Sequence, residues 1–348
     1  MHMSDALITP VVGGVLWAGT AATTGYSVRK LSRDDLIEGK KIPLMGVIGA
    51  FVFAAQMINF TIPGTGSSGH IGGGLLLAAM LGPQAGFLTL MAVLAIQGLF
   101  FADGGLLAMG CNIINIGFFS CYVAYPLIFR PMLRKGVSPG RLTTSSILAS
   151  VLGLQLGAFA VVLETVLSGR TELPFGPFAL AMQPIHLVIG AVEGLITAAV
   201  LVFLHRVQPE AITGLPDSRP AGSGFPKKAV AVIAVLALVV GGGLGWFASA
   251  NPDGLEWSMI RVAGTAELKA SGSVHDAVGS VQEATALLPD YGFKASGNTH
   301  EAATEASLPA VNTGTSVAGI VGSAVTLALA GLIGLLLFLL KRRQRIQH

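Results

Sequence analysis

Charged residues are scarce in this chain. Asp, Glu, Lys and Arg make up 11% of its 348 residues, whereas an average soluble domain contains about 25%. The net charge of +3 is too small to indicate binding to nucleic acid. The 46 Gly and 17 Pro residues lie among apolar residues rather than in polar tracts. The composition therefore excludes a soluble globular domain, a disordered chain and a nucleic-acid-binding protein.

Several chemical motifs are missing as well. The two cysteines, Cys111 and Cys121, are separated by about 15 Å if they lie on one helix, so they cannot form a disulfide with each other. The sequence contains neither a G-x-x-x-x-G-K-[ST] motif for ATP phosphates nor the H-E-x-x-H motif of a zinc protease. None of its apolar runs is rich in arginine, which excludes a voltage sensor.

Long apolar runs are abundant. Hydrophobic residues make up 52% of the chain and its mean hydropathy is +0.72. A helix needs about 20 apolar residues to cross roughly 30 Å of hydrocarbon. The runs that approach this length, of which the third is short, are 10–27, 42–60, 72–81, 85–101, 106–129, 143–167, 184–204, 229–249 and 316–340. The sequence therefore predicts an all-α polytopic membrane protein with about nine transmembrane helices.

The distribution of basic residues predicts the orientation of these helices. With nine spans, nearly all of the 21 Lys and Arg residues fall on the same side as the C-terminus. The exceptions are Arg170, Arg261, Lys269 and Lys294. Because basic loops stay in the cytoplasm, we expect a multi-pass protein of the inner (plasma) membrane with its N-terminus outside and its C-terminus inside. The first ten residues lack the basic region of a signal peptide, so we expect the first span to be retained.

The chain divides into two predicted modules. In order, these are a seven-span module at 1–207, a linker at 208–226 and a two-span hairpin at 227–348 with an outer loop at 250–315. The linker is rich in Pro, Gly and Ser, which is typical of a flexible segment. The composition of the outer loop indicates a small, poorly packed domain. Its histidines, His275 and His300, are interpreted as solvated surface residues.

The N-terminus itself is the first candidate metal site. It reads M-H-M-S-D, and the amine of Met1, the amide nitrogen of His2 and Nδ1 of His2 can close two fused chelate rings on one ion. These three nitrogens lie in a plane, which Ni²⁺ and Cu²⁺ accept and which tetrahedral Zn²⁺ does not favour. The alternative is an ordinary chain start that has a histidine at position 2 by chance.

A glycine-rich segment after the second predicted span is the second candidate. Residues 59–74 contain one histidine, His70, on the same predicted side of the membrane as Met1. Non-helical backbone inside a membrane protein has to line an enclosed cavity. We therefore expect a re-entrant loop in which His70 supplies a fourth nitrogen. The alternative is a histidine at the membrane interface.

Polar residues in and beside the spans form the third group. The candidates for orienting metal ligands are Gln56, Asn59, Ser68, Asn112 and His186. Intramembrane polar residues usually face the bundle interior, and hydrogen bonding between helices is the alternative role. His186 with Glu193 is also the only pair that a membrane-embedded metal-dependent enzyme could use, and it lacks a nucleophile.

These motifs together resemble a known family. Residues 1–7 (M-H-M-S-D-A-L), 59–60 (N-F) and 66–73 (G-S-S-G-H-I-G-G) are similar to the cobalt/nickel substrate-binding subunits of energy-coupling factor (ECF) transporters, the CbiM/NikM family. This likeness covers about residues 1–207. Residues 251–257 (N-P-D-G-L-E-W) resemble the PDGLE signature of the small N component. The whole chain thus resembles a fused NikMN-type protein.

The resemblance implies a function. In the family four nitrogens hold the metal, and they correspond here to the amine of Met1, the amide and imidazole of His2, and His70. Ni²⁺ or Co²⁺ is the transported ion, and no prosthetic group is implied. Many relatives begin Met-His-Ile, so Met3 departs from the family, and its thioether is a candidate for the axial position.

The resemblance also implies partners. These are a membrane coupling protein of the CbiQ/NikQ type and ATPases of the CbiO/NikO type, besides the lipid bilayer. We therefore expect the substrate-specificity component of an ECF ABC transporter that imports Ni²⁺. The alternatives are a Co²⁺ uptake component for cobalamin synthesis and, from another class, the membrane-embedded enzyme.

Overall fold

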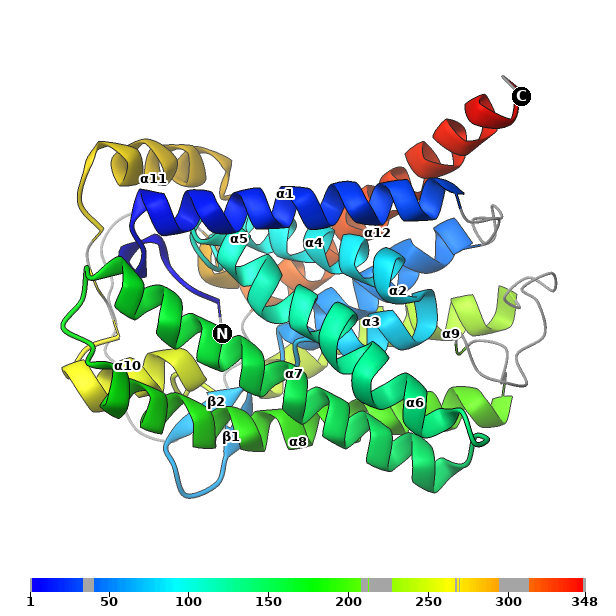
Figure 1. Cartoon of the computed structure of the whole chain (residues 1–348), viewed down its shortest axis with the longest axis horizontal. Helices are drawn as coiled ribbons and strands as arrows, with labels where there is room; N and C mark the ends of the chain where they lie inside the picture. The colour runs from blue at the N-terminus through cyan, green and yellow to red at the C-terminus, as the bar shows by residue number, and fades with distance from the viewer. Residues whose placement is uncertain are drawn as a thin grey trace.

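Long helices that run side by side make up most of the molecule (Figure 1). The computed structural model describes residues 2–33, 41–207, 212, 227–266, 268, 270–293 and 313–346. Among these residues, five helices are long and apolar enough to cross a membrane by length and composition. They are α4 (Pro83–Phe100), the helix Met109–Leu133, α7 (Pro139–Ser168), α8 (Phe175–Val207) and α12 (Thr313–Ile346) in its part Gly314–Leu336. The predicted all-α membrane fold is confirmed, and the count of nine spans stays a prediction.

The remaining bundle helices differ in length. They are α1 (Pro10–Arg33), α2 (Lys41–Gln56), α3 (Gly74–Leu81) and α9 (Lys227–Gly242). With eight residues, all of them buried, α3 rises only about 12 Å and is too short to cross a membrane by itself. It is followed directly by α4, which begins at Pro83.

Prolines lie inside two of the long helices. The helix Met109–Leu133 consists of α5 (Met109–Asn112), the π-helical η2 (Ile113–Phe129) and α6 (Arg130–Leu133), and it contains Pro126. The predicted start of the seventh span at residue 184 is wrong, because α8 begins at Phe175 and Pro184 lies inside it. Neighbouring helices can satisfy the carbonyl group that such a proline leaves without a donor.

The second part of the chain packs directly onto the first. Helices α9 and α12 lie against α2. The outer segment between them forms η4 (Leu244–Phe247), α10 (Gly254–Ala263), α11 (Ser273–Thr285) and η5 (Pro289–Tyr291). Helix α10 packs on α8, and α11 packs on α4. Both lie at one end of the bundle (Figure 1), so the described part of the outer loop is a cover rather than a loosely packed domain.

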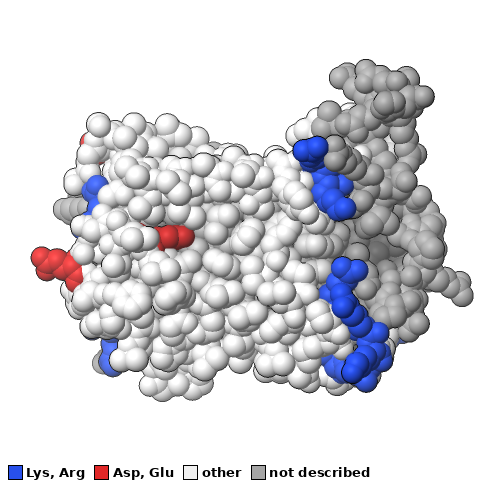
Figure 2. All heavy atoms as spheres, in the orientation of Figure 1, with Lys and Arg blue, Asp and Glu red and all other residues white. Residues whose placement is uncertain are grey.

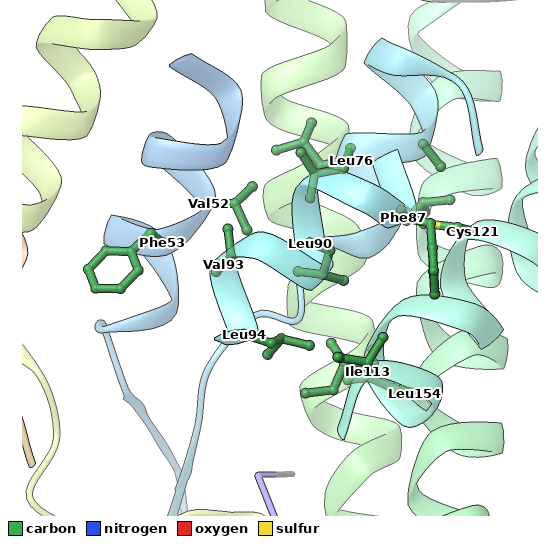
Figure 3. Close-up of a cluster of buried hydrophobic side chains, with 14 of the residues drawn as sticks. Val52, Phe53, Leu76, Phe87, Leu90, Val93, Leu94, Ile113, Cys121 and Leu154 are labelled. Atoms are coloured by element: carbon green, nitrogen blue, oxygen red, sulfur yellow. The ribbon is translucent and has the colours of Figure 1, made fainter. Parts of the chain in front are cut away.

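Apolar and basic side chains are separated along the bundle. Buried residues of α2, α3, α4, η2 and α7, among them Phe53, Phe87 and Leu154, form a continuous core (Figure 3). On the face drawn in Figure 2, Lys and Arg gather at the end of the bundle opposite to α10 and α11.

Two short segments enter the covered end of the bundle. Residues 2–8, with η1 (Asp5–Leu7), fold back beneath α1 (Figure 1). They are held there by burial of Met3, Leu7 and Ile8, each at most 1% exposed. The second segment is an antiparallel hairpin of β1 (Phe60–Ile62) and β2 (Ser67–Gly69). His2 lies in the first segment, and His70 directly follows β2.

Candidate metal centre

Asn112 fixes the backbone of the N-terminal segment. Its Oδ1 accepts the N–H of Met3 at 2.8 Å, and its Nδ2 donates to the carbonyl of Met3 at 3.2 Å. The same carbonyl accepts the N–H of Gly105 at 2.9 Å. The backbone N–H and carbonyl of residue 3 are therefore both satisfied inside the bundle. This places the neighbouring residue, His2, in the pocket.

Glu193 and Gln56 hold the turn that follows His70. The carboxylate of Glu193, which is fully buried, accepts the N–H groups of Gly72 at 2.8 Å and Gly73 at 3.1 Å. Gln56 Nε2 donates to the carbonyl of Gly72 at 2.8 Å. Gly73 has a φ of +73°, and a Cβ there would lie 2.5 Å from a side chain of α2. The turn thus depends on two glycines and on a carboxylate from α8.

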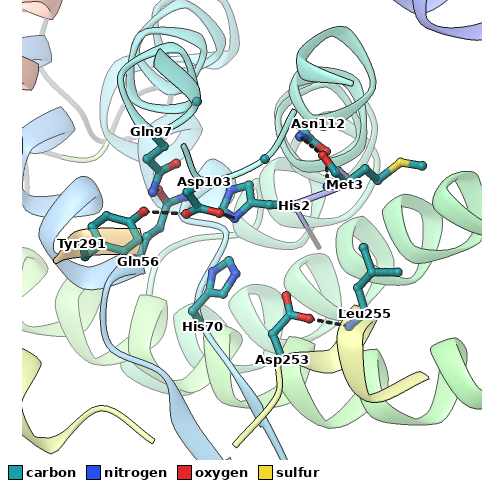
Figure 4. Close-up of polar contacts among 12 residues, drawn as sticks. His2, Met3, Gln56, His70, Gln97, Asp103, Asn112, Asp253, Leu255 and Tyr291 are labelled. Atoms are coloured by element: carbon teal, nitrogen blue, oxygen red, sulfur yellow. Dashed lines mark hydrogen bonds and ion pairs between the residues drawn. The ribbon is translucent and has the colours of Figure 1, made fainter. Parts of the chain in front are cut away.

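The imidazole rings of His2 and His70 are stacked. Their centroids lie 5.1 Å apart and their planes differ by 7° (Figure 4). Nδ1 of His70 lies 3.1 Å from the carbonyl of Ile71, so its N–H donates there and Nε2 carries the lone pair. Burial lowers the pKa of His70 to about 4. The ring is therefore neutral at neutral pH, which is the form that binds metal ions.

Asp103, in the loop between α4 and α5, faces His2. Its Oδ1 lies 3.1 Å from Nδ1 of His2, and its Oδ2 accepts the hydroxyl of Tyr291 at 2.5 Å (Figure 4). Burial alone would raise the pKa of Asp103. The adjacent His2 imidazole and the hydrogen bonds from His2 and Tyr291 outweigh burial and hold that pKa below its usual range. Nδ1, the nitrogen predicted as a ligand, thus lies beside a carboxylate.

The PDGLE segment docks on the hairpin that precedes His70. The carbonyl of Pro252 accepts the N–H of Ser68 at 2.8 Å, and the hydroxyl of Ser68 donates to the carbonyl of Asn251 at 2.7 Å. Asp253 then caps α10, since its side chain accepts the N–H of Glu256 while the side chain of Glu256 accepts the N–H of Asp253. These hydrogen bonds of Ser68 therefore go to the second module and not to His2 or His70.

Gly254 of the same segment packs against His186. A Cβ at residue 254 would lie 3.0 Å from Cε1 of His186. Nδ1 of His186 donates to the carbonyl of Met182 at 2.8 Å, and its Nε2 has no hydrogen-bond partner in the described part of the chain. His186 and His70 border the same small hollow. Glu193 binds the turn after His70 and makes no hydrogen bond to His186. The two residues of the hypothetical enzyme pair are therefore not paired with each other.

Both modules line a polar pocket that has a volume of about 430 Å³. The first supplies His2, Gln56, Asn59, His70 and Asp103, and the second supplies Asp253, Glu256, Gln282, Asp290 and Tyr291. Gln282 donates to the carbonyls of residues 98 and 104, at 2.9 and 2.8 Å, and Tyr291 stacks on Phe101 with ring centroids 5.1 Å apart. The second module thus forms part of the wall of this pocket.

The two histidines of the predicted outer loop, His275 and His300, differ in what the structure shows. His275 is only 4% exposed, and its Nε2 lies 3.0 Å from the carbonyl of Ile8. Its interpretation as a solvated residue is therefore wrong, because α11 presses it against the N-terminal segment. His300 and Met1 lie outside the described residues.

The side-chain donors near the pocket do not form a metal site by themselves. Among the described residues, no group of three or more His, Cys, Asp or Glu side chains could hold a metal ion. The thioether of Met3 points away from His2 and His70 (Figure 4) and lies 3.8 Å from Asn115, which does not favour an axial role. Any ion bound between the two imidazoles therefore needs donors from the backbone.

Sequence reasoning missed several pocket residues, among them Asp103, Asp253 and Tyr291. Asp103 stands in the Gly-rich stretch A-D-G-G on the predicted outer side, a signal that could have been used. Asp253 lies within the PDGLE motif but was noted only as part of a signature. For Tyr291 the sequence carries no signal, because its place depends on how the outer segment folds back.

Comparison with known proteins places the chain in a family. Residues 2–211 match the family CbiM, described as the cobalt uptake substrate-specific transmembrane region, and residues 227–339 match the PDGLE domain. A putative metal transport protein of Haloquadratum walsbyi is 35% identical over 61% of this chain and 93% of its own length. A putative fused nickel transport protein NikMN of Archaeoglobus fulgidus is 34% identical over 69% of this chain and 75% of its own.

Solved structures agree with this likeness. A crystal structure of a truncated transition metal transporter is 31% identical, with a TM-score of 0.52, and the match covers 60% of this chain and 99% of that chain. The suspected fusion of a CbiM-type and a PDGLE-type component is thereby confirmed. With its helical bundle, its buried N-terminal segment and a family match over more than half its length, this chain belongs to the CbiM family of transmembrane regions for cobalt uptake and carries a PDGLE domain behind it.

Proposed function

We propose that this chain is the substrate-specificity component of an ECF-type ABC transporter that imports Ni²⁺. The observation that carries the proposal is the stacking of His2 and His70, which are far apart in the sequence, inside one pocket. As a member of a metal-uptake family, the chain is a transport component and not an enzyme.

The proposed ligands are four nitrogens in a plane. They are the terminal amine of Met1, the amide nitrogen and Nδ1 of His2, and Nε2 of His70. The neutral state of His70 and the shortage of side-chain clusters in the described part of the chain support this set. On binding, Nδ1 of His2 exchanges its contact with Asp103 for the ion. Planar nitrogen ligation suits Ni²⁺.

The separation of charges supports a direction of transport. Lys and Arg gather at the end of the bundle away from the pocket (Figure 2), and we propose that this end faces the cytoplasm. The N-terminus and the PDGLE cover then face outward, where the ion enters. Since the sequence has no phosphate-binding loop for ATP, hydrolysis takes place on CbiO/NikO-type ATPases that act through a CbiQ/NikQ-type coupling protein.

Nickel is the proposed ion and cobalt is the alternative. Relatives of fused architecture, such as those of Archaeoglobus fulgidus and Rhodobacter capsulatus, carry names of nickel transport. Another relative, from Geobacter sulfurreducens, is named a cobalt transport protein. The fused architecture and the planar ligand set together favour Ni²⁺ for this chain.

The test compares the native N-terminus with a variant that carries one Gly before Met1. Ni²⁺ and Co²⁺ are titrated into purified protein, and binding is followed by calorimetry and by the visible absorption band of planar Ni²⁺. The added residue moves the amine out of the chelate while every side chain stays in place. We expect the band and tight binding to disappear.

Two further results complete the test. Unchanged binding in the extended variant contradicts the amine–His2 chelate. Uptake of Ni²⁺ by cells that lack the co-expressed ATPase contradicts the assignment to an ATP-driven transporter. The metal that the native protein prefers decides between nickel and cobalt.

A further inference from the structure

Four buried side chains with metal-binding atoms meet next to the N-terminal segment. They are a thioether, a thiol, an amide and a carboxylate, from Met3, Cys111, Asn115 and Glu164, with exposed fractions of 0%, 0%, 0% and 6%. Asn115 Nδ2 donates to Glu164 Oε2 at 2.8 Å and lies 3.8 Å from Met3 Sδ. The thiol of Cys111 lies close enough to the carboxylate of Glu164 to interact with it. The four side chains thus form one connected group from three segments.

Packing alone does not account for this group. Glu164 lies in α7 and faces the interior of a membrane protein, where a carboxylate is costly without a partner of opposite charge. Its contacts within the described part of the chain are neutral, namely Asn115 and Cys111. The Oδ1 atom of Asn115 is buried and has no hydrogen-bond partner there. A cation beside Glu164 would supply the missing positive charge, and a turn of the Asn115 amide would bring its Oδ1 to the same ion.

The group lies next to the proposed nitrogen site. Met3 follows His2 directly, and Asn112 fixes its backbone through two hydrogen bonds. Its side chain extends away from His2 and His70 (Figure 4). The side chain of Met3 therefore joins the backbone next to His2 to the group around Glu164.

We propose that Met3, Cys111, Asn115 and Glu164 form a second site for the transported ion, inward of the first. The identity of the ion, Ni²⁺ or Co²⁺, rests on the proposed function. With about 2.0–2.2 Å from metal to oxygen and about 2.3 Å from metal to sulfur, neighbouring ligands of a tetrahedral ion lie roughly 3.3–3.7 Å apart, and the separations of 2.8 and 3.8 Å lie on either side of this spacing. For this, the amide of Asn115 turns to present Oδ1.

The donor set defines which ions the site takes. Cys111 binds as the thiolate, and its proton is released to water as the ion enters. Two sulfur donors favour transition metals over Mg²⁺ and Ca²⁺, which prefer oxygen ligands. The second site would thus exclude hard cations on the inward route.

Cobalt binding to the full-length protein tests the proposal. Co²⁺ is titrated into purified wild type, Cys111→Ala and Cys121→Ala, and the sulfur-to-cobalt charge-transfer absorption is recorded together with the number of ions bound. Cys121 is a matched control, since it is equally buried on the same helix but lies in the apolar core (Figure 3). We expect wild type and Cys121→Ala to show the band and a second ion, and Cys111→Ala to lose both.

Further variants separate this inference from the proposed function. The Gly extension before Met1 removes the nitrogen site and leaves the charge-transfer band, whereas Glu164→Gln weakens the band and leaves the planar Ni²⁺ signal. The planar Ni²⁺ signal also shows that the Cys111, Cys121 and Glu164 variants are folded, and the charge-transfer band shows the same for the Gly-extended protein. A wild-type protein without a charge-transfer band at saturating Co²⁺, or a band that survives Cys111→Ala, overturns the second site.

Discussion

The two modules contribute to the pocket in different ways. The first module carries the imidazoles of His2 and His70 and holds their backbone through deeply buried contacts, those of Asn112 and Glu193. The second module covers the pocket with the capped start of α10, the hydroxyl of Tyr291 and several carboxylates. We therefore predict that the first module sets the affinity for the ion and that the second module sets access to it. Changes in the first module should alter how tightly an ion is held, and changes in the second should alter how fast it exchanges.

Removal of the Glu193 carboxylate should have the largest effect. In Glu193→Ala, the N–H groups of Gly72 and Gly73 lose their acceptors, and each unsatisfied buried group costs about 1–3 kcal/mol. We expect the free energy of unfolding to fall by about 4 kcal/mol and the planar Ni²⁺ band to weaken, because His70 is no longer held. Denaturant unfolding in detergent and Ni²⁺ absorption measure the two effects.

Two controls accompany this variant. Glu193→Gln keeps one acceptor oxygen and should lose about half as much stability. Glu172→Ala removes an exposed carboxylate just before α8 and should behave as wild type. Full Ni²⁺ affinity in Glu193→Ala would break the link between this carboxylate and the His70 turn.

A methyl group at Gly254 should loosen the cover. Its Cβ would meet the His186 ring at 3.0 Å, and overpacking of this kind costs about 1–3 kcal/mol. We expect Gly254→Ala to release bound Ni²⁺ to a chelator faster than wild type, with a smaller change in equilibrium affinity. In the control Gly279→Ala, on α11, the Cβ meets nothing within 4 Å, so release should not be accelerated. An unchanged release rate in Gly254→Ala would contradict the role of the cover.

Loss of the Tyr291 hydroxyl should have a smaller effect. Tyr291→Phe keeps the stacking on Phe101 but removes the hydrogen bond to Asp103, and a hydrogen bond to a charged group contributes about 1.5–3 kcal/mol. We expect a loss of stability at the lower end of that range, because this contact is half-buried, and a modest gain in the rate of Ni²⁺ release. Tyr26→Phe, at an exposed tyrosine on α1, is the control. A large loss of affinity would show that the second module also sets binding strength.

Protonation of His70 should have the smallest effect. Burial lowers the pKa of His70 from the ordinary value of 6.5 to about 4. The imidazole of the folded protein therefore stays neutral down to about pH 4, and protons compete with the metal ion for it only below that pH. Binding should still weaken on acidification, because the amide of His2 has to lose its proton. The slope of log affinity against pH, measured from about pH 6 to 8, should be the same in His70→Ala as in wild type. A shallower slope in the variant would show that His70 titrates in this range.

The helices could be predicted because an apolar segment in a membrane has few other ways to satisfy its backbone. Their ends were less accessible to prediction. The apolar run predicts a span that begins at residue 184, whereas the structure places Pro184 inside α8, which other helices of a membrane bundle can tolerate. The short buried α3 could not be told from a full span by hydropathy.

The candidate site also contains residues that the sequence predicts and residues that it does not. The chelate at His2 involves neighbouring atoms of one short segment, and His70 is the single histidine of its loop, so both could be singled out from residue type alone. Asn112 and Gln56 are predicted to orient ligands; the structure shows them bonded to the backbone of residues 3 and 72, beside the candidate histidines, and their role in ligation stays a prediction. Glu193 was considered only as part of an enzyme pair, because nothing in its own helix points to the turn that it holds.

The sequence by itself predicted an all-α membrane protein and singled out residues whose nitrogens suit a transition metal. Those properties belong to single segments, through apolar length and the chemistry of adjacent donors. Only the tertiary structure decided that Asp103 faces His2, that Tyr291 reaches Asp103, and that Gly254 lies against His186. These contacts join segments from distant parts of the chain, and their partners are chosen by the packing of whole helices, which no local pattern encodes.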